Sequence, residues 1–260
     1  MNGMKQRVIT GIVAAALFLP LAYLGGVYFE LLVFLMATIG LSELLRMRKI
    51  SWFSFQGILS FVLLWIILLP ENTVKEVTKL EGLLTIIFII LTVTVLTKNR
   101  FTFDDAAFII LSGLYVGAGF FYVSETRAEG LAYLFFVLFS IWAADSGAYF
   151  IGRKFGKRKL WPEISPKKTV EGAIGGIISA LALAFVFYMI LPFEENLLFM
   201  LLIAFAASIF GQIGDLVESA FKRHYGVKDS GTILPGHGGI LDRVDSWLFV
   251  MPVLHFLHLL

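Results

Sequence analysis

The chain gathers carboxylate side chains within residues 211–245, although only 15% of its residues are charged. Four residues in the first part of this stretch would share one face of a helix, because the last three follow the first by three, four and seven residues. The residues on this face are Asp215, Glu218, Ser219 and Lys222. Asp242 and Asp245 follow, three residues apart, at the start of the last apolar segment. Converging carboxylates beside basic side chains suit a divalent cation that holds phosphate groups.

A glycine-rich loop separates these two groups of carboxylates. Its glycines are Gly231, Gly236, Gly238 and Gly239. Glycine lets a backbone come close to a ligand and turn its N–H groups toward an anion, so we expect the loop to bind phosphate. A simpler interpretation is that a loop in water is merely polar. That interpretation explains any one of these residues, but it explains the whole set poorly.

The composition places the chain in a membrane. Of its 260 residues 58% are hydrophobic and 26 are Phe, and the mean hydropathy is +0.87. A span of the hydrocarbon core needs roughly 20 apolar residues. Nine runs approach that length: Val8–Leu24, Val27–Leu45, Phe55–Leu69, Gly82–Thr97, Ala106–Val123, Leu131–Ile151, Gly172–Leu191, Leu197–Gly214 and Val244–Leu260. We therefore expect an all-α polytopic membrane protein with about nine transmembrane helices, of which the third and fourth are short.

The basic residues predict the orientation of these spans. With the N-terminus in the cytoplasm, Lys75, Lys79 and Arg127 lie outside, and the other 18 of the 21 Lys and Arg residues lie inside. Basic residues concentrate in cytoplasmic loops, so nine spans with the C-terminus outside is the consistent arrangement. The first run continues through Gly25 and Gly26 into the second without a convincing cleavage site, so we interpret it as a retained helix.

We expect one integral membrane domain, residues 1–260, without internal repeats or long linkers. Residues 1–130 are interpreted mainly as scaffold helices, in which Glu30 and Glu43 have structural roles near the ends of the second span. Residues 131–260 form the catalytic half, with cytoplasmic loops at 152–171 and 215–243. The absence of Cys excludes disulfides and Cys-ligated metals.

Asp145 lies inside the sixth apolar run, where an ionisable side chain is costly and should face the bundle interior or a wet cavity. Tyr149 follows at i+4 on the same face, and Arg153 lies two turns beyond Asp145. The loop after this run ends in a segment that joins hydroxyls to two lysines at an expected helix start, a combination that favours phosphate. Its residues are Ser165, Lys167, Lys168 and Thr169, followed by Glu171.

The stretch from Ser219 to Asp245 resembles a family signature. It reads S-x-F-K-R-x4-K-D-x-G-x2-L-P-x-H-G-G-I-x-D-R-x-D, and it is similar throughout to that of the phosphatidate cytidylyltransferases, or CDP-diacylglycerol synthases. We call residues 219–245 the signature. Further similar blocks lie around Asp145, around Lys168 and from Gly211 through Gln212 to Ser219. The matching segments extend from Trp142 to Asp245, and the first half is similar only in hydropathy.

The resemblance implies a bacterial inner-membrane enzyme that condenses CTP with phosphatidic acid, giving CDP-diacylglycerol and pyrophosphate with Mg²⁺, with its site facing the cytoplasm. It also implies a homodimer. The phosphate monoester of the lipid is largely dianionic at neutral pH, so the reaction needs charge neutralisation and alignment rather than a general base. The catalytic candidates are Asp215, Asp242, Lys222, Arg223, Lys228, Arg243 and His237.

The expected substrate and phosphate ligands form a larger set. They are Asp145, Tyr149, Arg153, Ser165, Lys167, Lys168, Thr169, Glu171, Gln212, Glu218, Ser219, Gly236, Gly238 and Gly239. Hard oxygen ligands, no Cys and few His favour Mg²⁺ over zinc. The expected metal ligands are Asp215, Asp242, Asp245 and Asp229, and the number of cations stays open.

Other functions share parts of this pattern. A transporter would place intramembrane carboxylates on several spans at mid-bilayer, whereas here they cluster at the cytoplasmic side. A CDP-alcohol phosphotransferase would carry a D-G-x2-A-R motif that the chain lacks. A CTP-dependent lipid or polyprenol kinase is the closest enzymatic alternative, and it would release CDP instead of pyrophosphate. Nothing indicates binding to nucleic acid.

Overall fold

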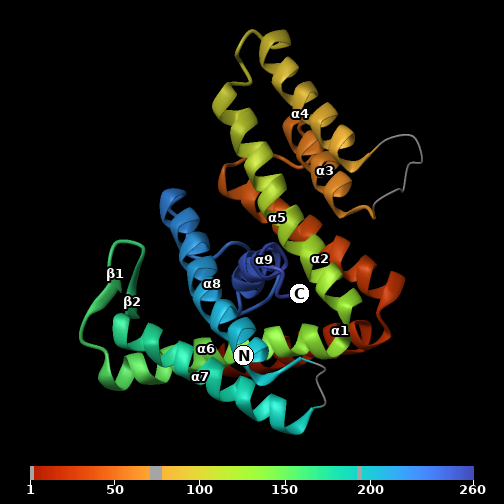
Figure 1. Cartoon of the computed structure of the whole chain (residues 1–260). Helices are drawn as coiled ribbons and strands as arrows, with labels where there is room; N and C mark the ends of the chain where they lie inside the picture. Colours follow the sequence, from red (N-terminus) through yellow and green to blue (C-terminus); the bar gives the residue numbers. More distant parts are fainter. Residues whose placement is uncertain (1–2, 71–77, 192–194) are drawn as a thin grey trace. The chain divides into compact units, whose positions relative to one another are not determined.

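The computed structural model describes residues 3–70, 78–191 and 195–260, and in them it contains nine α-helices and one two-stranded sheet (Figure 1). The elements are α1 (Gly3–Leu24), α2 (Gly26–Met47), α3 (Phe55–Leu68), α4 (Lys79–Leu96), α5 (Phe103–Glu129), α6 (Leu131–Phe155), β1 (Lys159–Trp161), β2 (Ser165–Thr169), α7 (Val170–Ile190), α8 (Leu197–His224) and α9 (Leu241–Phe256). They form two compact units: Met1–Ser124 with Asp229–Leu241, and Glu125–Lys228 with Asp242–Leu260.

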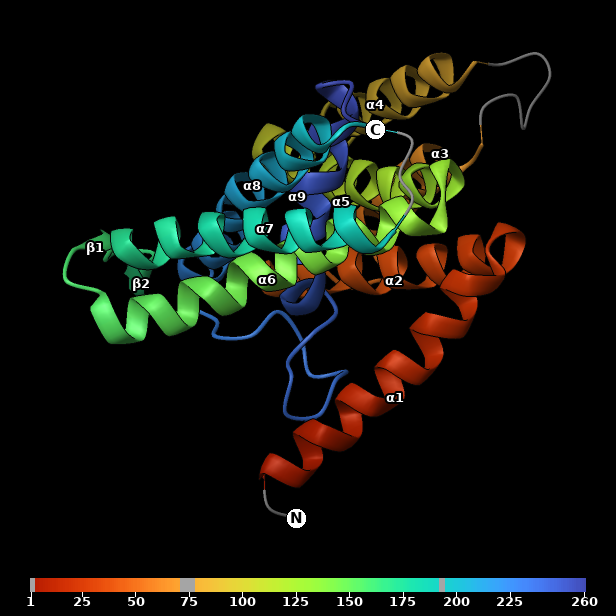
Figure 2. The ribbon, with the colours of Figure 1, turned by 60° about the horizontal axis from the view of Figure 1, so that its bottom comes forward.

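The first unit contains α1 to α4, most of α5 and the glycine loop, which we take as residues 229–240. Gly25 and Gly26 have positive φ angles and form the turn between α1 and α2, which diverge from it in Figure 2. Helix α5 packs closely on α3, because a Cβ on Gly113 would lie 2.8 Å from Leu63 and one on Gly117 would lie 2.8 Å from Ile67. Small residues in α5 thus let the two helices approach closely.

The second unit is organised around α6 and α7, which run side by side in Figures 1 and 2 with the β1–β2 hairpin at one end. Glycines let the two helices approach: a Cβ on Gly172 would lie 2.8 Å from the carbonyl oxygen of Ala148, and one on Gly176 would lie 2.7 Å from that of Ala144. The hairpin is antiparallel and pairs Trp161 with Ser165. The sequence predicted only a loop here, because strands of three and five residues are too short for a clear alternating pattern.

Helices α8 and α9 complete the second unit. Helix α8 has 28 residues and continues without interruption from the apolar segment into the signature. Gly214 lies against α9, where an added Cβ would be 2.8 Å from the carbonyl oxygen of Asp245. The Ser246 hydroxyl donates to the carbonyl oxygen of Gly211 over 3.0 Å. These contacts fix the beginning of α9 beside the carboxylates of α8.

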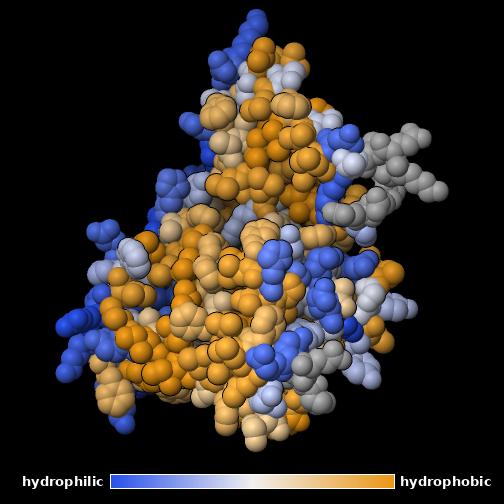
Figure 3. Space-filling view, viewed as in Figure 1, coloured by the Kyte–Doolittle hydropathy of each residue, from blue (hydrophilic) through white to orange (hydrophobic). Residues whose placement is uncertain are grey.

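Seven of the described helices are long and apolar enough to cross a membrane, as an integral membrane protein requires. Helix α3 has 14 residues and α9 has 16, so at 1.5 Å per residue they reach about 21 and 24 Å, short of a hydrocarbon core of roughly 30 Å. Figure 3 shows hydrophobic residues over α7 and hydrophilic residues at the hairpin end of the second unit. The all-α membrane fold is confirmed, whereas nine crossings and the sides of the two termini stay predictions.

The single-domain interpretation also stays a prediction. Residues 229–241, which the sequence placed in a loop of the catalytic half, cluster with the first unit. Lys75, one of the three basic residues expected outside, lies beyond the described residues.

Candidate active site

Seven ionisable side chains gather in the second unit, and we call them the acidic cluster. They come from α6, β2, α8 and α9, elements far apart in the sequence. The members are Asp145, Lys168, Asp215, Glu218, Lys222, Asp242 and Asp245. Each was a candidate in the sequence, and the second unit brings all seven together.

Asp215 forms the more accessible ion pair of the acidic cluster. Its carboxylate lies 2.7 Å from the Lys168 ammonium, and the side chains are 35% and 24% exposed. Ser219, one turn further along α8, donates its hydroxyl to Asp215 over 3.3 Å. Neighbouring residues of a strand point to opposite faces, so Lys168 reaches the carboxylates while Lys167 is exposed. The structure therefore separates two lysines that the sequence treated alike.

Lys222 forms the buried part of the acidic cluster. Its ammonium lies 2.5 Å from Glu218 and 2.7 Å from Asp242, whose side chains are only 1% and 5% exposed. The Glu218–Lys222 pair has the i, i+4 spacing of one helix face, and the bond to Asp242 joins α8 to α9. The second carboxylate oxygen of Glu218 is buried and has no hydrogen-bond partner within the described residues.

Asp145 and Asp245 add two further charges beside Asp215. Asp145 is exposed, is repelled electrostatically by Asp215 and is attracted by Lys168. Asp245 is repelled by Asp215 and Asp145, and its carboxylate accepts the backbone N–H of Ser246 over 2.8 Å. The polar surroundings expected for Asp145 are therefore the other members of the acidic cluster.

The acidic cluster has more negative than positive charge, because five carboxylates face two ammonium groups. Close like charges repel strongly where water is partly excluded, and a bound cation relieves that repulsion. The donor set of carboxylate oxygens fits Mg²⁺. Within the described residues no three Asp, Glu or His side chains form a ready-made metal site, since Lys168 and Lys222 occupy positions beside Asp215 and Asp242.

Several predicted phosphate ligands instead support the hairpin. Glu171 accepts the backbone N–H groups of Lys157 and Arg158 over 3.0 and 3.2 Å. Thr169 caps α7 by accepting the N–H of Gly172 over 3.1 Å, which confirms the expected helix start. Arg223 donates to the carbonyl oxygen of Ile164 over 3.2 Å. These bonds hold β2, and with it Lys168, beside α8.

Other candidates also belong to the second unit. Gln212 donates to the carbonyl oxygens of Ala173 and Ser208 over 3.3 and 3.0 Å, so it joins α7 to α8. Arg153 donates to the Tyr149 hydroxyl over 3.2 Å, and both side chains are exposed. Ser165 is half-buried, and Lys228 and Arg243 are exposed.

The glycine loop belongs to the first unit, together with Asp229 and His237. Gly236 and Gly238 have φ angles of 77° and 91°, a region open mainly to glycine. The N–H groups of His237 and Gly238 both donate to the carbonyl oxygen of Leu234, over 2.8 and 3.0 Å. These N–H groups, which the sequence assigned to phosphate, are thus directed into the loop itself.

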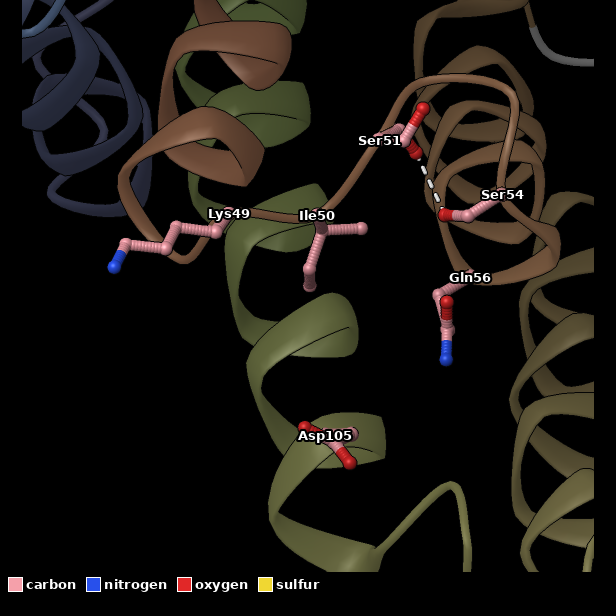
Figure 4. A pocket seen from close by; sticks show the side chains of 6 residues that line it. All are labelled: Lys49, Ile50, Ser51, Ser54, Gln56 and Asp105. Atoms are coloured by element: carbon pink, nitrogen blue, oxygen red, sulfur yellow. Dashed lines mark hydrogen bonds between the residues drawn. The ribbon is translucent and has the colours of Figure 1, made fainter.

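The first unit also has a polar hollow of about 310 Å³ between the end of α2, the start of α3 and α5 (Figure 4). Asp105 faces it from α5 and forms an ion pair with Arg48 at 2.7 Å. The Ser54 hydroxyl donates to the carbonyl oxygen of Ser51 over 2.6 Å. None of the predicted site residues lines this hollow.

Comparison with known proteins places the chain among cytidylyltransferases. The model of the cytidylyltransferase family matches residues 5–260. A Bacillus subtilis protein named phosphatidate cytidylyltransferase is 51% identical over 99% of this chain and 98% of its own length. Proteins with the same name from Staphylococcus epidermidis and Staphylococcus aureus are 51% and 48% identical, each over 98% of both chains. The resemblance noted in the signature is confirmed and extends over the scaffold helices.

Proposed function

Because this chain belongs to the cytidylyltransferase family, we propose that it transfers the cytidylyl group of CTP to phosphatidic acid. The products are CDP-diacylglycerol and pyrophosphate, so the chain is a nucleotidyltransferase of phospholipid biosynthesis. The observation that carries the proposal is the likeness, over almost the whole chain, to bacterial proteins named phosphatidate cytidylyltransferase.

The acidic cluster supplies groups that this reaction needs. A phosphate oxygen of phosphatidic acid attacks the α-phosphorus of CTP, a new P–O bond forms, and the bond to the β-phosphate oxygen breaks. The nucleophile is already anionic, so the protein's task is alignment and neutralisation of phosphate charge. Lys168 is the accessible ammonium group of the acidic cluster, and we assign it to phosphate. Lys222 is buried between two carboxylates, and we assign it to holding Asp242 in place.

Mg²⁺ is part of the proposal. Asp215 and Asp242 would hold the ion directly, with Asp245 as a further ligand or as a partner of one. Bound there, Mg²⁺ would neutralise phosphate charge and polarise phosphoryl oxygens. Mg²⁺ takes one or two carboxylates and completes its shell with water and substrate phosphates. Before substrate binds, the protein therefore needs no preformed metal site of three carboxylates.

The membrane arrangement follows from the same proposal. CTP is a cytoplasmic nucleotide, so the acidic cluster faces the cytoplasm. The basic residues favour that orientation, with nine crossings, the N-terminus inside and the C-terminus outside. The bacterial relatives support a place in the cytoplasmic membrane. A homodimer is the assembly that we propose from the family resemblance.

Product analysis tests the reaction directly. Purified protein in detergent receives phosphatidic acid, Mg²⁺ and CTP labelled at the α-phosphate. A cytidylyltransferase moves the label into lipid and releases one pyrophosphate per lipid formed. A CTP-dependent kinase leaves the label in CDP, and a transporter leaves CTP intact. Label in CDP with phosphorylated lipid would overturn the proposal in favour of the kinase.

A further inference from the structure

Glu43 on α2 is a buried carboxylate outside the acidic cluster. Its side chain belongs to the first unit and is 5% exposed. The carboxylate accepts three hydrogen bonds, from the Ser230 hydroxyl over 3.0 Å and from the N–H groups of Ile240 and Leu241 over 2.9 Å each. An ionised carboxylate only accepts hydrogen bonds, and here three donors converge on it.

These donors lie at both ends of the glycine loop. Ser230 follows the first residue of the loop, and Leu241 is the first residue of α9. The first N–H groups of a helix lack partners within the helix, and a carboxylate is the favoured group at that end. Between the two ends, the Thr10 hydroxyl donates to the carbonyl oxygen of Pro235 over 2.9 Å. The Glu43 side chain is therefore hydrogen-bonded to both the start and the end of the loop.

The same carboxyl group accounts for two glycines of the signature. A Cβ on Gly231 would lie 2.8 Å from Cδ of Glu43, and one on Gly239 would collide with both carboxylate oxygens and with the Ser230 hydroxyl. Gly236 and Gly238 differ from these two, because their φ angles of 77° and 91° require glycine for the backbone conformation. Gly231 and Gly239 are needed for space, which Glu43 fills at Gly231 and shares with Ser230 at Gly239.

We propose that Glu43 is a positioning residue of the reaction, which holds the glycine loop closed and fixes the backbone immediately before Asp242. The inference rests on the proposed function for its effect on turnover, but the closure of the loop is independent of that function. Glu43 touches no reacting atom in this scheme. It acts through Ile240 and Leu241, the two residues that precede Asp242 in the chain.

Glu43→Gln tests the proposal, because an amide keeps the size of the carboxylate but turns an NH₂ group toward at least one of the N–H donors. We expect cleavage within residues 229–241 by a protease of broad specificity to become at least about tenfold faster, since a buried donor loses its acceptor. We also expect kcat to fall at least about tenfold, with a smaller change in the KM for CTP. Glu30→Gln is the matched control, because Glu30 is an exposed carboxylate on the same helix.

A second pair of substitutions tests the contact itself. Gly231→Ala should accelerate cleavage of the loop, because its methyl group meets Glu43. Glu43→Asp withdraws the carboxylate by one methylene and makes room for that methyl group. The double variant should therefore be less impaired than the product of the two single effects predicts. Effects that simply multiply would show that residues 43 and 231 are independent, and would overturn the proposal.

The two readouts separate two kinds of failure. Unchanged cleavage and unchanged turnover in Glu43→Gln would overturn the role of Glu43, while the unaltered protein still formed CDP-diacylglycerol. Faster cleavage in the variant, with no CDP-diacylglycerol formed by the unaltered protein, would uphold the closure of the loop and overturn the proposed function.

Discussion

The acidic cluster and the glycine loop both contribute residues to the signature, yet their polar groups face different partners. In the acidic cluster, Asp145 is exposed, Asp215 is partly so, and the carboxylates outnumber the ammonium groups. In the loop and at the first residue of α9, Glu43 and Leu234 accept four backbone N–H groups. One region therefore has charge available for a ligand, and the other directs these backbone N–H groups to acceptors within the protein. The signature therefore contains residues that suit ligand binding as well as residues that stabilise the loop.

The largest effect on turnover is expected from substitutions of carboxylates in the acidic cluster. Asp215→Asn and Asp242→Asn should each lower turnover by about a thousandfold or more, because a metal contributes several kcal/mol and each 1.4 kcal/mol is about tenfold. The measurement is turnover against Mg²⁺ concentration, with Glu163→Gln on the exposed hairpin turn as the control. Wild-type rate and Mg²⁺ dependence in both Asn variants would overturn the proposed metal site at Asp215 and Asp242.

The next largest effect concerns stability within the acidic cluster. Lys222→Met takes the ammonium partner from the buried carboxylates of Glu218 and Asp242, which should destabilise the fold by about 3–5 kcal/mol. Thermal unfolding in detergent measures the loss. Adding Glu218→Gln to Lys222→Met should restore part of the stability but little of the turnover. Equal melting temperatures for Lys222→Met and the unaltered protein would place Lys222 outside the buried network.

A smaller effect should distinguish the two lysines of β2. Lys168→Gln removes the partner of Asp215, and we expect the KM for CTP or phosphatidic acid to rise about tenfold, the worth of one charge-assisted hydrogen bond. Lys167→Gln, one residue away and exposed, should change the KM less than about threefold. Steady-state kinetics on both substrates decides. Equal effects would favour a diffuse electrostatic role for the whole basic hairpin.

Asp145→Asn should have the smallest effect on turnover, about tenfold, because the amide keeps the shape and removes one charge from the acidic cluster. Ser146→Ala, at the next position, which is also exposed, is the control. Initial rates at saturating substrate make the comparison. Turnover equal to that of the control would show that Asp145 has only a structural role.

Accessibility labelling tests the orientation without changing the chemistry. Single cysteines at Glu163 and Thr232 should react only from the cytoplasmic side, and one at Asn196 only from outside. These three positions are exposed, and the native chain has no Cys. Ser230, though in the same loop, is unsuitable because it is buried against Glu43. Labelling of position 232 from outside would reverse the proposed topology.

Local patterns allowed part of this structure to be predicted. The helix face of Asp215, Glu218 and Lys222 follows from spacing alone, because helical periodicity is a property of neighbouring residues. The helix start at Thr169 was likewise expected from its immediate surroundings. Each of these predictions concerns a few residues close together in the sequence.

Contacts between segments that are far apart in the sequence could not be predicted from it. The different surroundings of Lys167 and Lys168 depend on a hairpin that the sequence pattern did not predict. The bond from Lys222 to Asp242 depends on how α9 returns to α8. Glu43 was interpreted as a carboxylate at a membrane interface, because nothing near it in the sequence indicates Ser230 or Leu241 as partners. One local signal was available, since the i, i+4 spacing of Glu218 and Lys222 already favoured an ion pair over a free lysine.

The uninterrupted length of α8 determines how deep in the membrane Asp215 lies. Asp215 lies 18 residues after Leu197, the first residue of the helix, which is about 27 Å along its axis. That distance is close to the roughly 30 Å of the hydrocarbon core. A helix that enters the core at Leu197 therefore presents Asp215 close to the opposite boundary of the core, next to the lipid headgroups. Phosphatidic acid can react there with its acyl chains still in the bilayer, and a thicker or thinner host membrane would misplace the carboxylate relative to the phosphate.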